Sequence, residues 1–497
     1  MHHLSLSNKL YLLTLPCLFS TFHFILNCIL LFQAKIILFF LPAFIVLHPA
    51  AAQTPPELQR LSKAIQFQTV SGTDSVSFNP GPFKNFISFL QENFPLTHQR
   101  LERKIINDYS LIYHWKGSGM SGNPVLLLAH YDVVPAEQKS LTRWQNPPFS
   151  GNIDSLFVWG RGALDDKSSI MAILEATENL LKENFHPTQA IYFAFGHDEE
   201  IGGYSGAKKI AESFKDMEFK FVLDEGGMMA KDLFPGMKKT IAFISTAEKG
   251  DINVELSVHE KGGHSAAPPK ETAIEIMAKA LIKINENPMK ARLQSPTDEM
   301  LKTLAPHLDA KTRFALRNRW LFKNKILKKL SDNYGTNSII RTVMSPTMIN
   351  GGIKENSLPA YVSANINIRP LQGDSIGTVL QHLKNKIKDD RVMINVKEPY
   401  HHASPITATD SKAYSLISKT ILQVYPDVVV APLLAPGTTD SRKYASLSKN
   451  VLRFIPVTLD NDSKEHIHGI NERIGIKEYL QAIRFYTELI KNLNKEY

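Results

Sequence analysis

Five side chains that can bind a metal ion follow short apolar runs or glycine-containing turns along this chain. They are His130, Asp165, Glu200, Asp224 and His468. Imidazole nitrogens and carboxylate oxygens are among the ligands that zinc takes in proteins. Five such residues are enough to hold two zinc ions if one carboxylate bridges both, so the pattern predicts a dinuclear metal site.

The first candidate ligand stands at the end of an apolar run. Residues 125–129 read VLLLA, which predicts a short buried strand, and His130 comes next. Because a metal-bound imidazole usually donates its other N–H to a carboxylate or carbonyl group, we expect Asp132 to orient His130. Downstream, the turn 160–167 (GRGALDDK) leads into a helical stretch and offers Asp165 as the bridging carboxylate.

Two adjacent carboxylates end the next apolar run. Residues 191–195 (IYFAF) predict a second buried strand, and GHDEE follows it. Adjacent side chains point in different directions, so one carboxylate can bind metal while the other handles a proton. We assign Glu199 as the general base for a metal-activated water and Glu200 as a ligand. Adjacent glutamates are more often surface charges, but the five apolar residues directly before this pair argue against that interpretation.

A third apolar run, residues 219–223 (FKFVL), precedes Asp224. In open parallel sheets, ligand sites gather beyond the carboxyl ends of the strands. Three strands that each end in an acid or a histidine should therefore converge on one crevice. The fifth candidate, His468, lies far downstream in the segment HGINE and completes the ligand set.

Six segments of the chain resemble, in order, those of a known enzyme family. They read LLLAHYDVVP, GRGALDDK, FAFGHDEEIGG, VLDEGG, KGGHSAAP and IHGINE. The series resembles the dinuclear-zinc aminoacylase and carboxypeptidase family, peptidase family M20. The segments HYDVVP, HDEEIGG and NINIRP are most similar to its carboxypeptidase S and N-fatty-acyl-amino-acid hydrolase branch. The similarity runs from about residue 55 to the C-terminus.

The resemblance implies a ligand arrangement and a reaction. One zinc ion would be held by His130 and Asp224 and the other by Glu200 and His468, with Asp165 bridging both. The implied enzyme is a zinc-dependent metallopeptidase or amidohydrolase. It would cleave an amide bond next to a free carboxylate, as carboxypeptidases and N-acyl-amino-acid hydrolases do, in a small peptide or an N-acyl amino acid.

Further residues are similar to the family's substrate site. His264, in the segment GGHS, resembles a histidine that reaches across a dimer to stabilise the tetrahedral oxyanion. Arg369, in NIRP, has a planar fork suited to a substrate carboxylate, although a plain ion pair is an equally good interpretation. Asn356 and Thr438 are additional candidates for substrate contacts.

The ligands stop at Asp224 and resume at His468, which predicts an inserted domain. The α/β catalytic domain, with a mostly parallel central sheet and helices on both faces, would comprise residues 54–247 and 399–497. Inside the insertion, residues 248–398, the expected elements are strand 252–259, helix 271–285, strands 338–344 and 361–368, helix 375–388 and strand 392–396. This βαββαβ order predicts a ferredoxin-like α+β lid, with residues 289–333 as a helical insertion. By resemblance, the lid would join two subunits in a homodimer.

Composition and the N-terminal region set further limits. With 497 residues, 43% of them hydrophobic, the chain can bury the cores of two domains. Its two cysteines, Cys17 and Cys28, both precede residue 53, so the catalytic part has no disulfide, cysteine nucleophile or thiolate metal site.

Residues 36–47 are apolar and precede an A-x-A site, which predicts an export signal and a periplasmic or extracellular enzyme. Residues 10–32 could span a bilayer, so a retained membrane anchor within 1–53 is the alternative.

The net charge of +9 is spread out except for one basic cluster. Its members are Lys311, Arg313, Arg317, Arg319, Lys323, Lys325, Lys328 and Lys329. Interleaved with them are Phe314, Leu316, Leu321, Phe322, Ile326 and Leu327, a pattern that predicts an amphipathic helix. We expect its charged face to be solvated, rather than a membrane-surface or anionic-ligand site. Nucleic acid is not an expected partner, because no module that binds it accompanies the charge.

Two other function classes fit parts of the pattern. A catalytically inactive binding relative would ordinarily have lost a ligand or the base, and here all of them are present. A dinuclear metal phosphoesterase would need similar metals, but the chain lacks a phosphate-binding loop.

Overall fold

A computed structural model of the protein describes residues 54–72, 78–119, 122–232, 234 and 236–496. The predicted export signal or membrane anchor at residues 1–53 therefore lies outside the described residues. Among the described residues, none of the helices combines the length and the apolar character needed to cross a bilayer. Residues from Pro55 onward form one unit.

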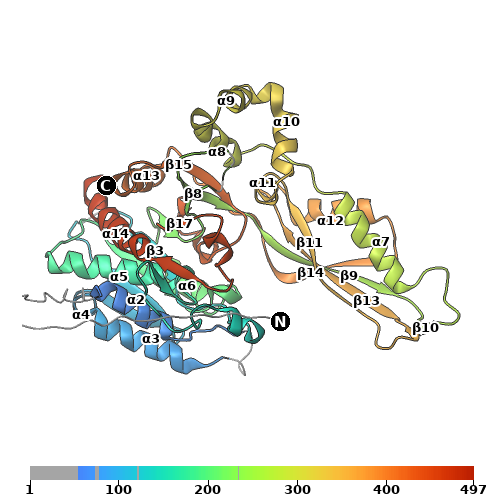
Figure 1. The fold of residues 1–497 in the computed structure, drawn as a ribbon, viewed down its shortest axis with the longest axis horizontal. Coiled ribbons are helices and arrows are strands. Elements are labelled where there is room, and N and C mark those ends of the chain that lie inside the picture. The colour runs from blue at the N-terminus through green and yellow to red at the C-terminus, as the bar shows by residue number, and fades with distance from the viewer. Residues whose placement is uncertain (1–53, 73–77, 120–121, 233, 235, 497) are drawn as a thin grey trace, which may run out of the picture. The chain divides into compact units, whose positions relative to one another are not determined.

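The main sheet has ten strands and a parallel centre (Figure 1). Strand β3 (Val125–His130) pairs in parallel with β5 (Ile191–Gly196) on one side and with β6 (Val222–Asp224) on the other. Next to β6 comes β16 (Val451–Arg453), also parallel. The carboxyl ends of these strands meet at one edge, which is where His130 and the acidic segments that follow β5 and β6 lie.

Both faces of this sheet are buried, as its mostly parallel strands require. Leu127 and Ala129 of β3 pack into a core with helices α5 and α14, while Leu126 and Leu128 pack on the opposite face against α6. Because side chains alternate along the strand, β3 contributes residues to two hydrophobic cores, one on each face of the sheet. The predicted α/β class with helices on both faces is confirmed.

The remaining elements outside the lid complete this unit. Its helices are α2 (Pro56–Gln66), α3 (Pro80–Asn93), α4 (Pro95–Arg100), η1 (Gln138–Arg143), α5 (Lys167–Lys182), η2 (Glu199–Ile201), α6 (Ala207–Ser213), α13 (Lys412–Val424), η4 (Asp440–Tyr444), η5 (Ser463–Glu465) and α14 (Ile476–Glu496). Its other strands are β1 (Glu102–Ile106), β2 (Ser110–Trp115), β4 (Phe157–Trp159), β7 (Met229–Ala230), β8 (Ile241–Glu248), β15 (Val429–Ala435), β17 (Thr458–Leu459) and β18 (Arg473–Gly475).

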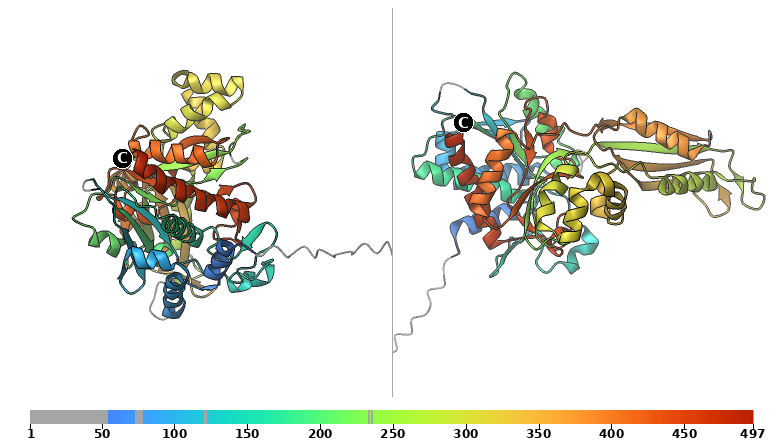
Figure 2. Two further views of the ribbon diagram at one scale, coloured as in Figure 1. Left: turned by 90° about the vertical axis from the view of Figure 1, so that its left-hand side faces the viewer. Right: turned by 90° about the horizontal axis from the view of Figure 1, so that it is seen from above.

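A second, four-stranded sheet is built from the inserted segment. It contains β9 (Asp251–His259), β11 (Val343–Gly351), β13 (Tyr361–Arg369) and β14 (Val392–His401), in the order β11-β13-β9-β14 with every pair antiparallel. Helices α7 (Ala273–Glu286) and α12 (Ile376–Ile387) contact each other and cover one face; Figure 2 shows them, in green and orange, along the strands. This is the βαββαβ arrangement expected of the lid. Beyond β9, the two-residue strands β10 (Gly263–His264) and β12 (Ser357–Leu358) pair with each other.

The helical insertion differs in detail from the expectation. It contains α8 (Thr297–Leu304), η3 (Ala305–His307), α9 (Ala310–Arg317), α10 (Arg319–Ser331) and α11 (Tyr334–Ser338). The strand predicted at 338–344 is wrong in its start: β11 begins at Val343, because Ile339 and Ile340 are buried in the insertion's own core. The single amphipathic helix predicted over the basic cluster is two helices, with a break at Asn318.

Candidate metal centre and active site

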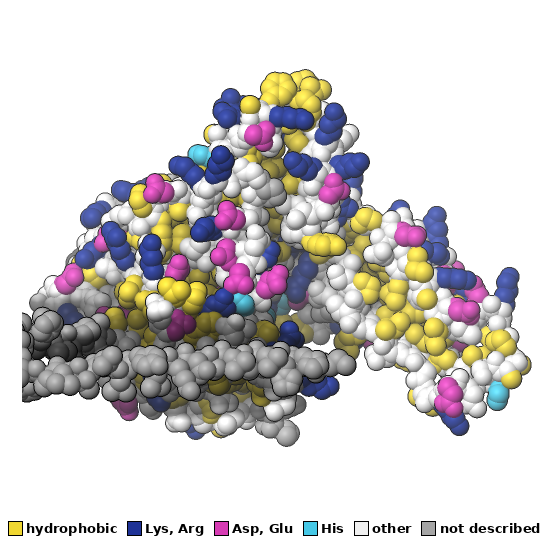
Figure 3. Space-filling model, in the orientation of Figure 1, with side chains coloured by type: hydrophobic (Ala, Val, Ile, Leu, Met, Phe, Trp, Pro, Cys, Tyr) yellow, Lys and Arg dark blue, Asp and Glu magenta, His cyan; other side chains and the backbone are white. Residues whose placement is uncertain are grey.

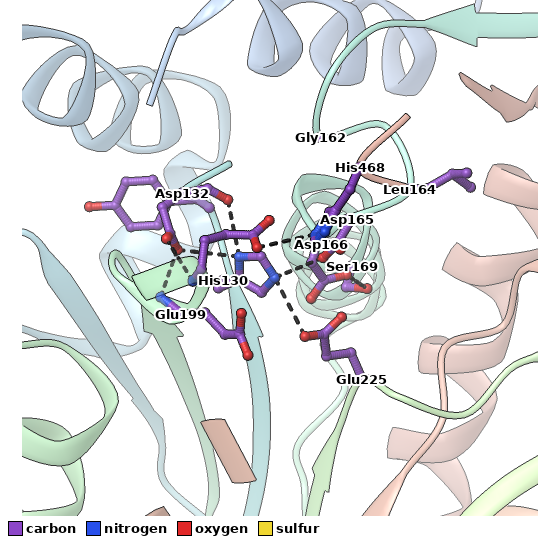
Figure 4. A network of polar contacts seen from close by, with 12 residues as sticks. His130, Asp132, Gly162, Leu164, Asp165, Asp166, Ser169, Glu199, Glu225 and His468 are labelled. Atoms are coloured by element: carbon purple, nitrogen blue, oxygen red, sulfur yellow. Dashed lines mark hydrogen bonds and ion pairs between the residues drawn. The ribbon is translucent and has the colours of Figure 1, made fainter. Parts of the chain in front are cut away.

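Two histidines from opposite ends of the sequence reach the same carboxylate. Nε2 of His130 lies 2.9 Å from Oδ1 of Asp165, and Nε2 of His468 lies 3.1 Å from its Oδ2 (Figure 4). The structure therefore places Asp165 between the two predicted halves of the metal centre. A carboxylate with one oxygen directed to each half is the geometry that a bridging ligand needs.

Asp132 connects His130 to the segment that carries Glu199 and Glu200. Nδ1 of His130 donates to the Asp132 carbonyl oxygen over 3.0 Å and lies 3.3 Å from its Oδ1. The Asp132 carboxylate in turn accepts from the backbone N–H of Glu199 and of Glu200, each over 3.1 Å. Burial raises the pKa of Asp132, but the neighbouring His130 and the N–H of Glu200 contribute to a larger opposite effect, so the pKa is lowered. Asp132 is thus a fixed anion that orients both segments.

The Glu199 and Glu200 side chains face different partners. Oε2 of Glu200 lies 3.1 Å from Nε2 of His468, and its buried Oε1 has no hydrogen-bond partner among the described residues. The Glu199 carboxylate extends below the His130 ring toward Glu225 in Figure 4. Burial and the nearby charge of Glu225 raise the pKa of Glu199 well above its usual range, which favours a group that accepts and returns protons.

Glu225, and not Asp224, stands beside His130. Oε1 of Glu225 lies 3.5 Å from Nε2 of His130. The Asp224 carboxylate instead accepts from the backbone N–H of Ser441 over 2.7 Å. The structure therefore corrects the position expected from the sequence: Asp224 anchors the loop around Ser441, and the residue after it offers its oxygen to the cluster. Successive side chains of a strand point to opposite faces of the sheet, so the Asp224 and Glu225 carboxylates point in different directions.

The cluster has the donor set and the electrostatics of a cation site. Within the described residues, ligand atoms approach one another within 4.8 Å in two groups, His130 with Asp166 and Glu225, and Asp165 with Glu200 and His468. Burial raises the pKa of Glu200 and Glu225, and hydrogen bonds to Asp165 and Glu200 raise that of His468 to about 10. Crowded buried carboxylates of this kind are stabilised by divalent cations. The buried Oδ2 of Asp166 also has no partner among the described residues.

Arg161 and Glu472 hold the two loops that carry Asp165 and His468. Nη1 of Arg161 donates to Glu472 over 2.5 Å, while its Nη2 donates to the carbonyl oxygens of His468 and Gly469. Oε1 of Glu472 accepts from the N–H of Leu164 and, over 3.2 Å, of Asp165. Sequence reasoning missed both residues, although they lie inside the segments GRGALDDK and IHGINE. The spacing of Arg161 and Glu472 in the sequence does not indicate that the side chain of each would bind the segment that contains the other.

The loop of His468 is further constrained by the backbone. His468 adopts a left-handed conformation with φ 58°, which is uncommon for a residue other than glycine. Strand β18 pairs with β4, so residues 473–475 lie against residues 157–159. The pairing brings the two loops together from distant parts of the sequence, and it fixes His468 opposite Asp165.

The predicted substrate residues do not all come together within one chain. His264 is exposed in β10, and Asn356 lies beside it, where its carbonyl oxygen accepts from Ser265. Both lie beyond the far end of β9, a nine-residue strand, hence on the order of 25–30 Å from the lid end that adjoins β8. Arg369 lies at that near end, in β13. Thr438 is half-buried in the loop after β15.

A family model matches residues 126–492, and its description is peptidase family M20/M25/M40. The chain belongs to this family. The matched region contains every candidate metal ligand and Glu199. The protein is accordingly a metal-dependent amide hydrolase of the M20/M25/M40 peptidases, and the predicted enzyme class is confirmed.

Individual relatives agree with this membership. The chain is 42% identical over 443 residues to a probable carboxypeptidase S-like 2 of Dictyostelium discoideum, covering 88% of this chain and 85% of the relative. It is 38% identical to the N-fatty-acyl-amino acid synthase/hydrolase PM20D1 of Bos taurus, with 87% of each chain covered. The M20 family metallo-carboxypeptidase Sso-CP2 of Sulfolobus solfataricus shares the fold, with a TM-score of 0.67 and 19% identity over 89% of this chain and all of that one.

Proposed function

We propose that this M20/M25/M40 peptidase uses two zinc ions to hydrolyse the amide bond next to a free carboxylate in a small peptide or an N-acyl amino acid. The observation that carries the proposal is the Asp165 carboxylate, which has one oxygen on His130 and the other on His468. The names of the relatives, a probable carboxypeptidase S-like protein and an N-fatty-acyl-amino acid synthase/hydrolase, support the substrate class.

The ligand atoms divide between two positions. His130 and Glu225 would serve one ion, Glu200 and His468 the other, and Asp165 both. Zinc suits this set because the ligands are imidazoles and carboxylates and the chain offers no thiolate there. Bound ions would supply Lewis acidity to the scissile carbonyl and lower the pKa of a water.

Glu199 would act as general base and general acid. Its carboxylate forms no hydrogen bond or ion pair with a described residue, so it is free to take a proton from the attacking water. The backbone N–H of Glu199 is held by Asp132, which fixes the position of the base. After attack, Glu199 passes its proton to the leaving nitrogen, and the amide bond breaks.

Arg369 would hold the substrate carboxylate. Its Nε donates to Asn367 over 3.1 Å and lies 3.7 Å from a carboxylate oxygen of Asp251, as it would in the alternative of a structural ion pair. Against that alternative, Nη1 is buried and has no partner among the described residues. A substrate carboxylate would satisfy this donor.

A homodimer through the lid would complete the site. His264 and Asn356 lie at the far end of the lid, too distant from Arg369 to contact one small substrate within the same chain. A second subunit could supply His264 as the oxyanion donor.

The test is a substrate panel with metal control. Purified protein is assayed with Gly-X dipeptides, N-acetyl and N-oleoyl amino acids and a phosphodiester, before and after chelation and after zinc is restored. We expect release of an amino acid from at least one amide substrate, loss on chelation and recovery with zinc. Hydrolysis of only the phosphodiester would support a phosphoesterase, and bound metal without any hydrolysis would support an inactive binding relative. Activity that survives complete metal removal would contradict the proposal.

A further inference from the structure

The α9–α10 hairpin of the helical insertion exposes three large apolar side chains. Trp320 is 80% exposed, Leu321 62% and Phe314 60%. All three lie close to the break at Asn318, where α9 passes into α10. We call this end of the hairpin, with Phe314, Trp320 and Leu321, the hairpin tip.

The fold does not account for the hairpin tip. The inner side of the hairpin is packed through Leu316, Ile326 and Leu330, which are buried in the core of the insertion. Phe322 packs partly against that core and meets the ring of Phe314 edge to face, with centroids 5.9 Å apart. The three tip side chains therefore stay in water although the helices are already anchored without them, and such an apolar patch indicates an interaction site.

The two helices of the hairpin carry only basic charged side chains, and Asp309 and Asp332 directly flank them in sequence. Residues 310–331 contain eight lysines and arginines and no aspartate or glutamate. Six of the eight, Lys311, Arg317, Lys323, Lys325, Lys328 and Lys329, are exposed. None of the six forms an ion pair within the part of the chain that the structure describes. Figure 3 shows hydrophobic side chains at the end of the hairpin with Lys and Arg side chains close to them.

We propose that the hairpin tip docks on the surface of a lipid bilayer that carries anionic headgroups. Aromatic and leucine side chains favour the boundary between headgroups and acyl chains, where Trp320 can enter with its ring. The exposed lysines around it and Arg317 would meet lipid phosphates and carboxylates, so charge and apolar surface act on the same occupant. The sequence predicts a solvated helix face here, and docking on lipid is the alternative that we propose. This alternative does not depend on the substrate class proposed above.

The fluorescence emission of Trp320 can itself report the docking of the hairpin tip on lipid. The other three tryptophans, Trp115, Trp144 and Trp159, are each less than 10% exposed, so a change of emission on lipid binding arises at Trp320. The full-length protein is mixed with phosphatidylcholine vesicles, with and without phosphatidylserine, and with lipids brominated in the acyl chains. We expect a shift to shorter wavelength and quenching by bromine when phosphatidylserine is present, and reversal of both at high salt. Vesicle binding through residues 1–53 alone would leave the emission unchanged.

Charge variants test the electrostatic part. Replacing Lys323, Lys325, Lys328 and Lys329 by Gln should weaken binding to the anionic vesicles by at least about tenfold. The matched control replaces four exposed lid lysines, Lys270, Lys290, Lys384 and Lys386, by Gln and changes the net charge equally. It should bind like the wild type.

Apolar variants test insertion. Leu321→Ser together with Phe314→Ser should reduce the Trp320 shift, while Ile353→Ser, at a lid residue that is 99% exposed, should not. Hydrolysis of a soluble substrate should be unchanged in the variants of the α9–α10 hairpin, because none of the hairpin residues contacts the metal centre. The proposal is overturned if the Trp320 emission does not respond to anionic vesicles, if both lysine sets weaken binding equally, or if the emission responds to an acidic protein or RNA and not to lipid.

Discussion

The Glu225 carboxylate lies 3.5 Å from Nε2 of His130, on the side of the ring that faces Asp165. Its neighbour Asp224 belongs to a different network, which ties the strand end to the N–H of Ser441. The structure thus separates two adjacent acids into one that points into the metal centre and one that supports the chain behind it.

Substitution at these two positions should therefore have different consequences. Glu225→Gln should reduce the bound metal from two equivalents to one, because it removes an anionic ligand from the His130 half. Asp224→Asn should keep both equivalents and lower the free energy of unfolding by about 1–2 kcal/mol, since it weakens a buried hydrogen bond to a charged acceptor. Elemental analysis and urea denaturation of both variants check this. Loss of metal from Asp224→Asn, with Glu225→Gln fully loaded, would reverse the assignment.

Glu199→Gln should lower kcat by about 10²–10⁴-fold, the usual contribution of a general base, while the metal content stays at two equivalents. The isosteric amide keeps the size of the side chain and the backbone N–H that Asp132 binds. Steady-state kinetics and metal analysis on the same preparation provide the measurement. A variant with near-normal kcat would mean that another group takes the proton.

Glu472→Gln should weaken metal binding by about 10–100-fold, because Glu472 holds Arg161 and the N–H groups of the loop that carries Asp165. Glu175→Gln is the matched control, since Glu175 is also buried and pairs with Arg60 at 2.6 Å away from the cluster. The control should lose stability but not metal affinity. Competition with a chelator measures both variants, and equal metal affinities would show that Glu472 has only a structural role.

Lys249 should make stability depend on pH in the alkaline range. Burial lowers the pKa of Lys249 to about 7, whereas an unfolded lysine titrates near 10.5. Between these values the unfolded chain binds the proton and the folded chain does not, so this group makes stability rise with pH, by up to about 1.4 kcal/mol per pH unit.

Lys249→Met should remove that contribution. Its free energy of unfolding, subtracted from that of the wild type at pH 7.5, 8.5 and 9.5, should leave a difference that grows in favour of the wild type. The loss of the hydrogen bonds from Lys249 to Ser338 and Arg341 lowers stability at every pH and does not change the slope. A flat difference would show that Lys249 stays protonated in the folded protein.

Mixed dimers test whether His264 acts across subunits. His264→Ala and Glu199→Ala should each be inactive alone. Co-expressed, they should regain about a quarter of the wild-type activity, because half of randomly paired dimers are mixed and each mixed dimer has one intact site out of two. Separately purified and unmixed proteins are the control. If the mixture stays inactive although mixed dimers form, His264 does not serve a partner's site.

The sequence by itself determined which segments converge at the candidate metal centre. The short apolar runs at residues 125–129 and 191–195 predict buried strands, and the carboxyl ends of parallel strands meet at one edge. The positions of Asp165 and His468 at that edge, and the βαββαβ order of the lid, are as the sequence predicts.

Only the tertiary structure decided which of two adjacent acids faces the candidate metal centre, which residues far apart in the sequence meet, and which apolar side chains stay exposed. Asp224 and Glu225 are both acids, so their residue types do not show which of them faces His130. That depends on the face of the sheet to which each side chain points. Arg161 and Glu472 lie far apart in the sequence and meet where β4 and β18 pair. The sequence does not predict the exposure of Trp320 either. A periodic apolar pattern does not show which of its side chains the rest of the fold will cover.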